Sequence, residues 1–152
     1  MDEGDKIVSV FPIESDQQKI VIVSSRSFIN CYGIDQIPLV SKSAKGVKAM
    51  GLKTDDKIAN CFLFDQLATQ YALVTNYCIK RFDGSVLPFG NRTNLGKTIS
   101  SFVANNTNIW TIKVLPLIPN TVLTYVNTTG EKDFLNICLV NVMTNPIVSI
   151  SL

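Results

Sequence analysis

The segment AKGVKAMGL, residues 44–52, decides the fold class because it recurs along the chain. Its glycine, Gly46, is followed 50 residues later by Gly96 in NLGKTISSF, residues 94–102. A further step of the same length reaches Pro146 in NPIVSISL. A period near 50 residues indicates an array of similar structural units.

Two other motifs recur at nearly the same spacing. The first appears as VFPI (10–13), CFLF (61–64) and VLPL (114–117). The second appears as SSRSFINCY (24–32), VTNYCIKRF (74–82) and VNTTGEKDF (126–134). The 152 residues are therefore predicted to form a single repeat domain, 1–152, with three units at 1–53, 54–107 and 108–152.

Each copy has the composition of short strands rather than helices. In the first copy the strand-like segments are residues 6–13, 19–25, 27–33 and 46–53, with Gly, Pro, Asn and Asp between them. Residues 6–13 are rich in β-branched side chains, and residues 46–53 show a period-2 alternation. No stretch shows an apolar stripe with helical spacing and caps. The prediction is an all-β fold with about four strands per copy. Two architectures remain open at this point: a propeller-like array with one blade per copy, and a β-trefoil acting as a protein or glycan interaction module.

The composition excludes several kinds of chemistry. Hydrophobic residues make up 46% of the chain and charged residues 17%, which argues against disorder. The chain has no histidine, and its cysteines, Cys31, Cys61, Cys78 and Cys138, form no C-x-x-C pair, so a structural zinc site is not expected. Cys61 and Cys78 are predicted to be small core residues in a reducing compartment. The segment Gly90–Thr98 resembles a phosphate loop, but its glycine spacing is wrong, and we interpret it as a connection between blades.

No residue shows the environment of a catalytic nucleophile. Tyr32, Tyr71, Tyr77 and Tyr125 lie in strand-like contexts, and Trp110 is predicted to lie in the core. We therefore expect no catalytic activity and no cofactor. No apolar run reaches the length of a membrane span, and the acidic first residues do not form a signal peptide, so a cytosolic location is expected.

Three quoted segments of the first copy carry a family resemblance. EGDKIVSVFPI (3–13), KIVIVSSRSFINCYGIDQIPLV (19–40) and SAKGVKAMGLKTDDKI (43–58) resemble one blade of the C-terminal domain found in the A subunits of bacterial DNA gyrase and topoisomerase IV. The acidic turn of that blade recurs at Thr54–Lys57, and its hairpin recurs at Val74–Arg81. The resemblance extends over the whole chain and is weakest in the third copy.

The resemblance implies a β-pinwheel, a propeller-like disc whose blades exchange strands with their neighbours. It implies a non-catalytic domain that binds and bends duplex DNA without sequence preference and presents it to the catalytic core. The implied partners are duplex DNA, the ATPase partner subunit of the enzyme, and the remainder of the topoisomerase A subunit, with no membrane, in the bacterial cytoplasm at the nucleoid. The DNA-cleaving tyrosine is expected outside this chain.

The sequence also departs from the family pattern. It has three copies where the family has five or six, which predicts an incomplete disc, either a fragment of a longer subunit or a reduced domain. The glycine- and arginine-rich box of gyrase is reduced to Ser41–Gly46, which favours topoisomerase IV. The apolar segment 147–152 carries no charge and is expected to form an open strand edge.

Basic residues recur at the predicted rim of the first two copies. The net charge is only +2, so any affinity for phosphate has to come from local clusters of lysine and arginine. Lys42 aligns with Arg92, which would place cations at regular intervals. The predicted DNA-binding residues are Lys42, Lys45, Lys48, Lys80, Arg81, Arg92 and Lys97.

The third copy lacks these bases in the sequence alignment. Val142 stands opposite Lys42 and Arg92, and Val148 stands opposite Lys48. Lys132 aligns with Lys80, and Asp133 replaces Arg81. Because carboxylates repel phosphate, DNA is expected to contact the first two copies and not the third.

Overall fold

The computed structural model describes residues 3–66 and 68–117 and, beyond them, the backbone of four further strands. Strands are the dominant element: eleven are assigned in the described residues, with two short 3-10 turns and one helical turn. The strands are β1 Lys19–Ser24, β2 Phe28–Gly33, β3 Ile58–Leu63, β4 Gln70–Thr75, β5 Ile79–Asp83, β6 Lys97–Thr98, β7 Thr111–Pro116, β8 Val122–Asn127, β9 Lys132–Asn136, β10 Val142–Met143 and β11 Ile147–Ser151. The helical turns are η1 Ile34–Gln36, η2 Gly84–Val86 and α1 Ser101–Ala104.

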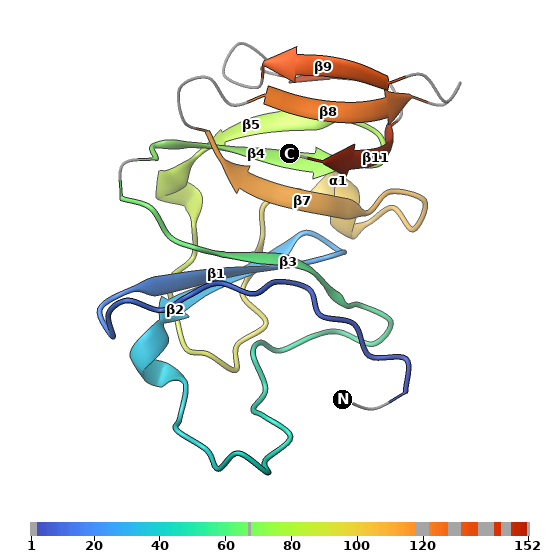
Figure 1. Cartoon of the computed structure of the whole chain (residues 1–152). Helices are drawn as coiled ribbons and strands as arrows, with labels where there is room; N and C mark the ends of the chain where they lie inside the picture. The colour runs from blue at the N-terminus through green and yellow to red at the C-terminus, as the bar shows by residue number, and fades with distance from the viewer. Residues whose placement is uncertain are drawn as a thin grey trace.

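The strands form three antiparallel sheets that lie one above another in Figure 1. The first sheet has the order β3-β1-β2-β6, the second β10-β5-β4-β7, and the third, in its described part, β11-β8-β9. The centre of the first sheet is the hairpin β1–β2, and its two outer strands come from the second sequence copy. The second sheet is built in the same way around β4–β5, with outer strands from the third copy. The predicted all-β fold with strand exchange between propeller-like units is confirmed.

Strand β1 is buried on both faces, which explains its unbroken run of apolar residues. Val21 and Val23 pack against the second sheet, in a cluster that includes Tyr71 and Leu73. Ile20 and Ile22 pack on the opposite face with Phe28, Tyr32 and Met50. A strand that faces two apolar layers needs no polar alternation. One core cluster therefore lies between the first and second sheets, and a second cluster covers the other face of the first sheet.

The β-trefoil alternative is wrong. The strands form separate sheets joined by donated edge strands, with no closed barrel of hairpins in the described part of the chain. Two strand predictions also fail: residues 6–13 and 46–53 have no strand assignment. Their counterparts β3 and β6 form ladders because each lies against the hairpin of the preceding copy, whereas the first copy has no preceding hairpin among the described residues. The segment GKTISSF, residues 96–102, is predicted to be a strand of the second copy, but its strand covers only Lys97–Thr98, since Ser100 caps a helical turn by accepting a hydrogen bond from the Val103 amide.

The register of the third copy differs from the sequence alignment. Lys132 pairs with Val126 as Ile79 pairs with Val74, so Lys132 corresponds to Ile79 and Asp133 to Lys80. The alignment is displaced by one residue because the β8–β9 connection is one residue longer than the β4–β5 connection.

The predicted counterparts of Val142 and Val148 are wrong for the same kind of reason. Met143 pairs with Ile79 as Lys97 pairs with Ile29, which places Met143, and not Val148, near the site of the second-copy bases. Val148 belongs to β11, the edge strand that completes the third sheet on β8. Pro146 and Cys138 lie outside the described residues.

Candidate nucleic-acid interface

Two loops with the same turn follow η1 and η2. In the first loop the Ala44 amide donates to the Ser41 carbonyl at 3.0 Å, and in the second the Asn94 amide donates to the Asn91 carbonyl at 3.0 Å. A glycine with positive φ follows each turn, Gly46 at 99° and Gly96 at 79°. Lys42 and Arg92 therefore occupy the same position of a repeated turn, as the sequence alignment predicted.

Arg92 ties the two loops together. Its Nε donates to the Gln36 carbonyl at 3.0 Å, and its Nη1 donates to the Lys48 carbonyl. Its backbone amide donates to Gln36 Oε1 at 2.8 Å. The guanidinium is always charged, so Arg92 positions the loop that carries Lys48 while it keeps its own positive charge.

A buried asparagine fixes the second loop to β2. Asn30 is 1% exposed, and its Nδ2 donates to the carbonyls of Asn91 at 2.8 Å and Arg92 at 3.2 Å. Gly96 lies directly on the same strand, because a Cβ added there would approach the Ile29 carbonyl oxygen to 1.9 Å. These contacts set the place of Lys97, which is exposed at the start of β6.

The two loops are basic and contain no carboxylates. Residues 36–54 include four lysines and no Asp or Glu, and residues 87–98 include Arg92 and Lys97, again with no Asp or Glu. Lys42, Lys45 and Lys48 are exposed. Lys53 is held differently, since its Nζ lies 4.7 Å from the centroid of the Phe28 ring. We call the surface formed by Lys42, Lys45, Lys48, Arg92 and Lys97 the loop face.

The other two predicted residues lie elsewhere. Lys80 and Arg81 belong to β5 in the second sheet, where Lys80 is exposed and Arg81 is half-buried. Five of the seven predicted bases therefore lie on the two loops joined by Arg92 or at the strand that follows them, and two lie on a different sheet.

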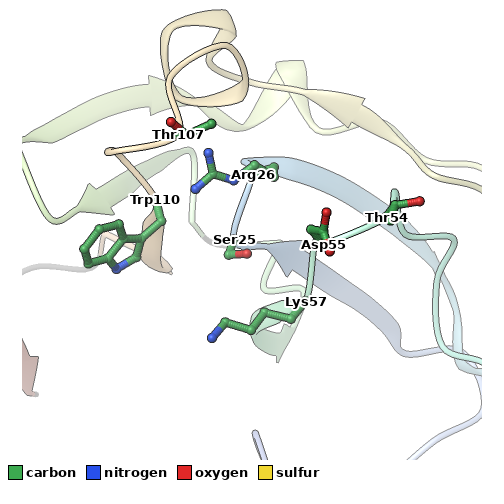
Figure 2. Close-up of a pocket in the computed structure, with 7 residues that line it drawn as sticks. All are labelled: Ser25, Arg26, Thr54, Asp55, Lys57, Thr107 and Trp110. Carbon is green, nitrogen blue, oxygen red and sulfur yellow. The ribbon is translucent and has the colours of Figure 1, made fainter.

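A polar cleft lies between the first and second sheets. Figure 2 shows its lining residues; the cavity volume is about 540 Å³. Arg26 is fixed there by a 2.9 Å hydrogen bond from its Nη1 to the Asn106 carbonyl, and Lys57, whose carbonyl accepts a hydrogen bond from the Ser25 amide at 2.8 Å, lies beside Ser25 in Figure 2. The lining residues are Ser25, Arg26, Thr54, Asp55, Lys57, Thr107 and Trp110.

The prediction for Trp110, one of the cleft residues, is wrong, and the sequence analysis did not single out two others, Arg26 and Lys57. Trp110 is 46% exposed, so its predicted place in the core is wrong. The residue immediately precedes β7, and its amide donates to Asn76 Oδ1 at 3.0 Å, which leaves the ring outside the sheet. No motif or repeated position marks Arg26 and Lys57 in the sequence, and only their closeness in the folded chain draws attention to them.

The described cysteines are free thiols. Cys31 is fully buried, and burial raises its pKa to about 12. Burial also raises the pKa of the partly buried Cys61. Among the described residues, no group of three or more His, Cys, Asp or Glu side chains could hold a metal ion. No helix in the described part of the chain has the length and apolar character needed to cross a membrane.

Comparison with known proteins relates this geometry to a family. The model of the DNA gyrase C-terminal domain, a β-propeller, matches residues 1–14 and 33–65. The chain is 36% identical over 80 residues to the DNA topoisomerase 4 A subunit of Streptococcus pneumoniae, an alignment that covers 53% of this chain and 9% of that protein. It is 23% identical over 146 residues to the DNA gyrase A subunit of Chlamydia pneumoniae, covering 94% of this chain and 17% of that protein.

Solved structures share the fold at low sequence identity. The C-terminal domain of DNA topoisomerase IV superimposes with a TM-score of 0.73 at 14% identity, covering 90% of this chain and 46% of that chain. The DNA gyrase A C-terminal domain gives a TM-score of 0.65 at 14% identity, covering 86% and 42%. The E. coli ParC C-terminal domain gives 0.60 at 18% identity, covering 81% and 50%.

The fold is therefore the propeller-like β-pinwheel of these domains. The predicted resemblance to the C-terminal domain of bacterial type IIA topoisomerase A subunits is confirmed, and the relatives in sequence are the A subunits of topoisomerase IV and DNA gyrase. The chain spans less than a fifth of the length of these two relatives and half or less of each of these solved domains.

Proposed function

We propose that this chain is a non-catalytic module of a topoisomerase IV or gyrase A subunit that binds and bends duplex DNA without sequence preference. The observation that carries the proposal is the loop face, where two carboxylate-free basic loops are locked together by Arg92. A rigid array of cations is suited to a ladder of phosphates, whose spacing does not depend on the base sequence.

The residues of the loop face have different roles in this proposal. Lys42, Lys45, Lys48 and Lys97 are exposed and contact phosphates, whereas Arg92 holds the loops in place. Lys80 and Arg81, on β5 of the second sheet, provide a second contact, and a duplex that touches both places is proposed to bend between them. With about four to eight phosphates engaged, log affinity should fall with log salt at a slope of about −0.9 per contact.

The third sheet is proposed to lie outside the DNA path. In the observed register Asp133 occupies the place of Lys80, and Met143 occupies the place of Lys97. The bound duplex is presented to the catalytic part of the A subunit, which works with its ATPase partner subunit in the bacterial cytoplasm. The relation to the named A subunits supports these partners.

The test is a gel-shift titration with a duplex of mixed sequence at low salt. The quadruple variant Lys42→Glu, Lys45→Glu, Lys48→Glu and Lys97→Glu should weaken binding by about 100-fold or more, because each reversal replaces a phosphate contact with a repulsion. Arg92 stays unchanged in this variant, so that the loops keep their arrangement. The matched control, Lys132→Glu, should bind nearly as well as the original chain. Equal binding by the quadruple variant and the original chain would refute the proposal.

A further inference from the structure

Ser25, which lines the cleft between the first and second sheets, is bonded to segments of the other two sequence copies. Its amide donates to the Lys57 carbonyl at 2.8 Å, and its carbonyl accepts a hydrogen bond from the Thr111 amide at 2.8 Å. Its hydroxyl donates to Asp56 Oδ1 at 2.8 Å, and the residue is only 7% exposed. The cleft is therefore built where three copies meet, and hydrogen bonds of the backbone set its shape.

The backbone of Trp110, at the edge of the same cleft, is held by Asn76. The Trp110 amide donates to Asn76 Oδ1 at 3.0 Å, and the Trp110 carbonyl accepts from the Asn76 amide at 3.3 Å. Asn76 Nδ2 also donates to the Asn108 carbonyl at 2.9 Å. Trp110 is nevertheless 46% exposed. A fixed residue with an exposed indole offers an aromatic face on which another planar group can stack.

Two cations of the cleft have no carboxylate bound to their charged ends. The guanidinium of Arg26 donates to the Asn106 carbonyl at 2.9 Å, a bond that fixes it and leaves its charge in place. The carboxylate that contacts Arg26 is that of Asp56, and it accepts from the backbone amide at 3.1 Å. Within the part of the chain that the structure describes, neither Arg26 nor Lys57 forms an ion pair. Both charges are available to an anionic ligand.

The charges of the cleft are separated in space. In Figure 2 the charged ends of Arg26 and Lys57 lie on the Trp110 side of Ser25, whereas Asp55 lies on the other side. An anion is attracted to the first side and repelled from the second. The aromatic face and the site for an anion are therefore neighbours, as a ligand with a planar group and a negative charge requires.

The other lining side chains favour a nucleotide over a peptide. Thr54 and Thr107 contribute hydroxyl groups, and no aliphatic side chain is among the described residues that line the cleft. A peptide would find no apolar pocket for a side chain. A nucleotide can stack its base on an aromatic ring, place its phosphate against cations and use hydroxyl groups for its sugar and phosphate oxygens. The volume of about 540 Å³ lies in the range of small-ligand sites.

We propose that the cleft binds a nucleotide with an unpaired base, either free or as part of single-stranded DNA. The base stacks on Trp110, and Arg26 and Lys57 hold the phosphate. A duplex does not fit this site, because each of its bases is stacked between neighbouring pairs and has no free face. The site is separate from the loop face and does not depend on the proposed binding of duplex DNA.

The test uses the fluorescence of Trp110, which is the only tryptophan of the chain. The full chain is titrated with deoxyadenosine monophosphate, with a single strand of about ten adenine nucleotides, and with a duplex of mixed sequence. The monophosphate or the single strand should quench the fluorescence to saturation, whereas the duplex should quench little. Equal potency of the first two identifies a free nucleotide as the ligand. Saturation by the strand at a much lower concentration identifies single-stranded DNA.

Charge variants test the place of the phosphate. Arg26→Gln and Lys57→Gln should each weaken the binding that quenches Trp110 by about 10-fold, because each removes a charged hydrogen-bond donor. Asp55→Asn should strengthen it, since it removes a repelling charge, and asparagine tolerates the φ of 68° at that position. Circular dichroism checks that the variants are folded. The control is Lys6→Gln, an exposed position outside the cleft, which should leave the binding unchanged.

Variants of Trp110 separate stacking from a purely structural role. With a fluorescently labelled single strand, anisotropy should show a loss of about 10-fold or more for Trp110→Ala, while Trp110→Phe keeps most of the affinity. Neither change should alter duplex binding, which the loop-face variants test separately. The proposal is overturned if neither nucleotide ligand quenches the fluorescence, or if the duplex quenches as strongly as the single strand. Equal quenching by a glutamate peptide of similar charge, or equal losses in the two Trp110 variants, would also overturn it.

Discussion

Asn60 and Val114 form a two-way hydrogen-bonded pair across the boundary between the first and second sheets. The Asn60 Nδ2 donates to the Val114 carbonyl at 2.9 Å, and the Val114 amide donates to Asn60 Oδ1 at 3.1 Å. Both residues are buried. The side-chain amide of Asn60 therefore acts as a short piece of backbone, joining β3 of one sheet to β7 of the next.

Replacing Asn60 should destabilise the chain by about 2–4 kcal/mol, because Asn60→Ala leaves a buried amide and a buried carbonyl of Val114 without partners. Urea unfolding followed by circular dichroism measures the change. Asn105→Ala, at an exposed position, is the control and should change the free energy of unfolding by less than about 0.5 kcal/mol. A loss of similar size in both variants would show that the pair does not join the sheets.

Arg92→Lys should loosen the loop face although it preserves the charge. Lysine cannot reproduce the planar set of donors that reaches the carbonyls of Gln36 and Lys48. Trypsin should then cut the loop at Lys42, Lys45 or Lys48 faster than in the original chain. Lys42→Arg, the conservative change at the equivalent turn position, is the control and should leave the cleavage rate near that of the original chain. No difference between the two variants would contradict the role of Arg92.

A single charge reversal should lower the affinity for duplex DNA more in the first copy than in the third. Lys45→Glu is expected to weaken duplex binding and to reduce the salt slope by about one unit, as the loss of one phosphate contact requires. Lys132→Glu should have a much smaller effect at the same salt concentration. Fluorescence anisotropy over a range of salt concentrations measures both quantities. Equal losses would place the third copy on the DNA path.

Stability should fall in mildly alkaline solution. Burial raises the pKa of Cys31 from 9.0 to about 12 and that of Tyr71 from 10.0 to about 12. Between about pH 9 and 12 the folded chain therefore binds more protons than the unfolded chain, so stability is full below about pH 9 and is lost as the pH rises. At about pH 10, one unit above the unfolded pKa of the thiol, Cys31 alone should cost about 1.4 kcal/mol.

Thermal unfolding at about pH 8 and about pH 10 tests this dependence. Cys31→Val removes the titrating group while keeping a small apolar side chain at the position, so it should show a smaller drop between the two pH values. If the variant and the original chain lose the same stability, the thiol is not responsible.

Local chemistry made the repeat and the equivalent turns predictable from the sequence. The strands around Val21 and Leu73 are marked by β-branched and apolar runs, and the match of Lys42 to Arg92 follows from a turn whose shape depends on a few neighbouring residues and one glycine. The third copy was misaligned because one extra residue between β8 and β9 shifts every later pairing, and periodicity alone does not reveal it.

Only the tertiary structure decided which residues meet. Strand donation in the first sheet pairs residues 34 to 70 positions apart, from Ser24–Ile58 to Phe28–Thr98. The sequence therefore does not show that β3 completes a sheet while residues 6–13 do not. The exposure of Trp110 and the bonds of Arg92 likewise depend on partners distant in the sequence. The sequence by itself determined the repeated unit, because strand and turn preferences are local. The packing of one unit against the next decided the register and the contacts of the loop face, because the backbone groups of a strand edge are paired only by the strand that lies beside it.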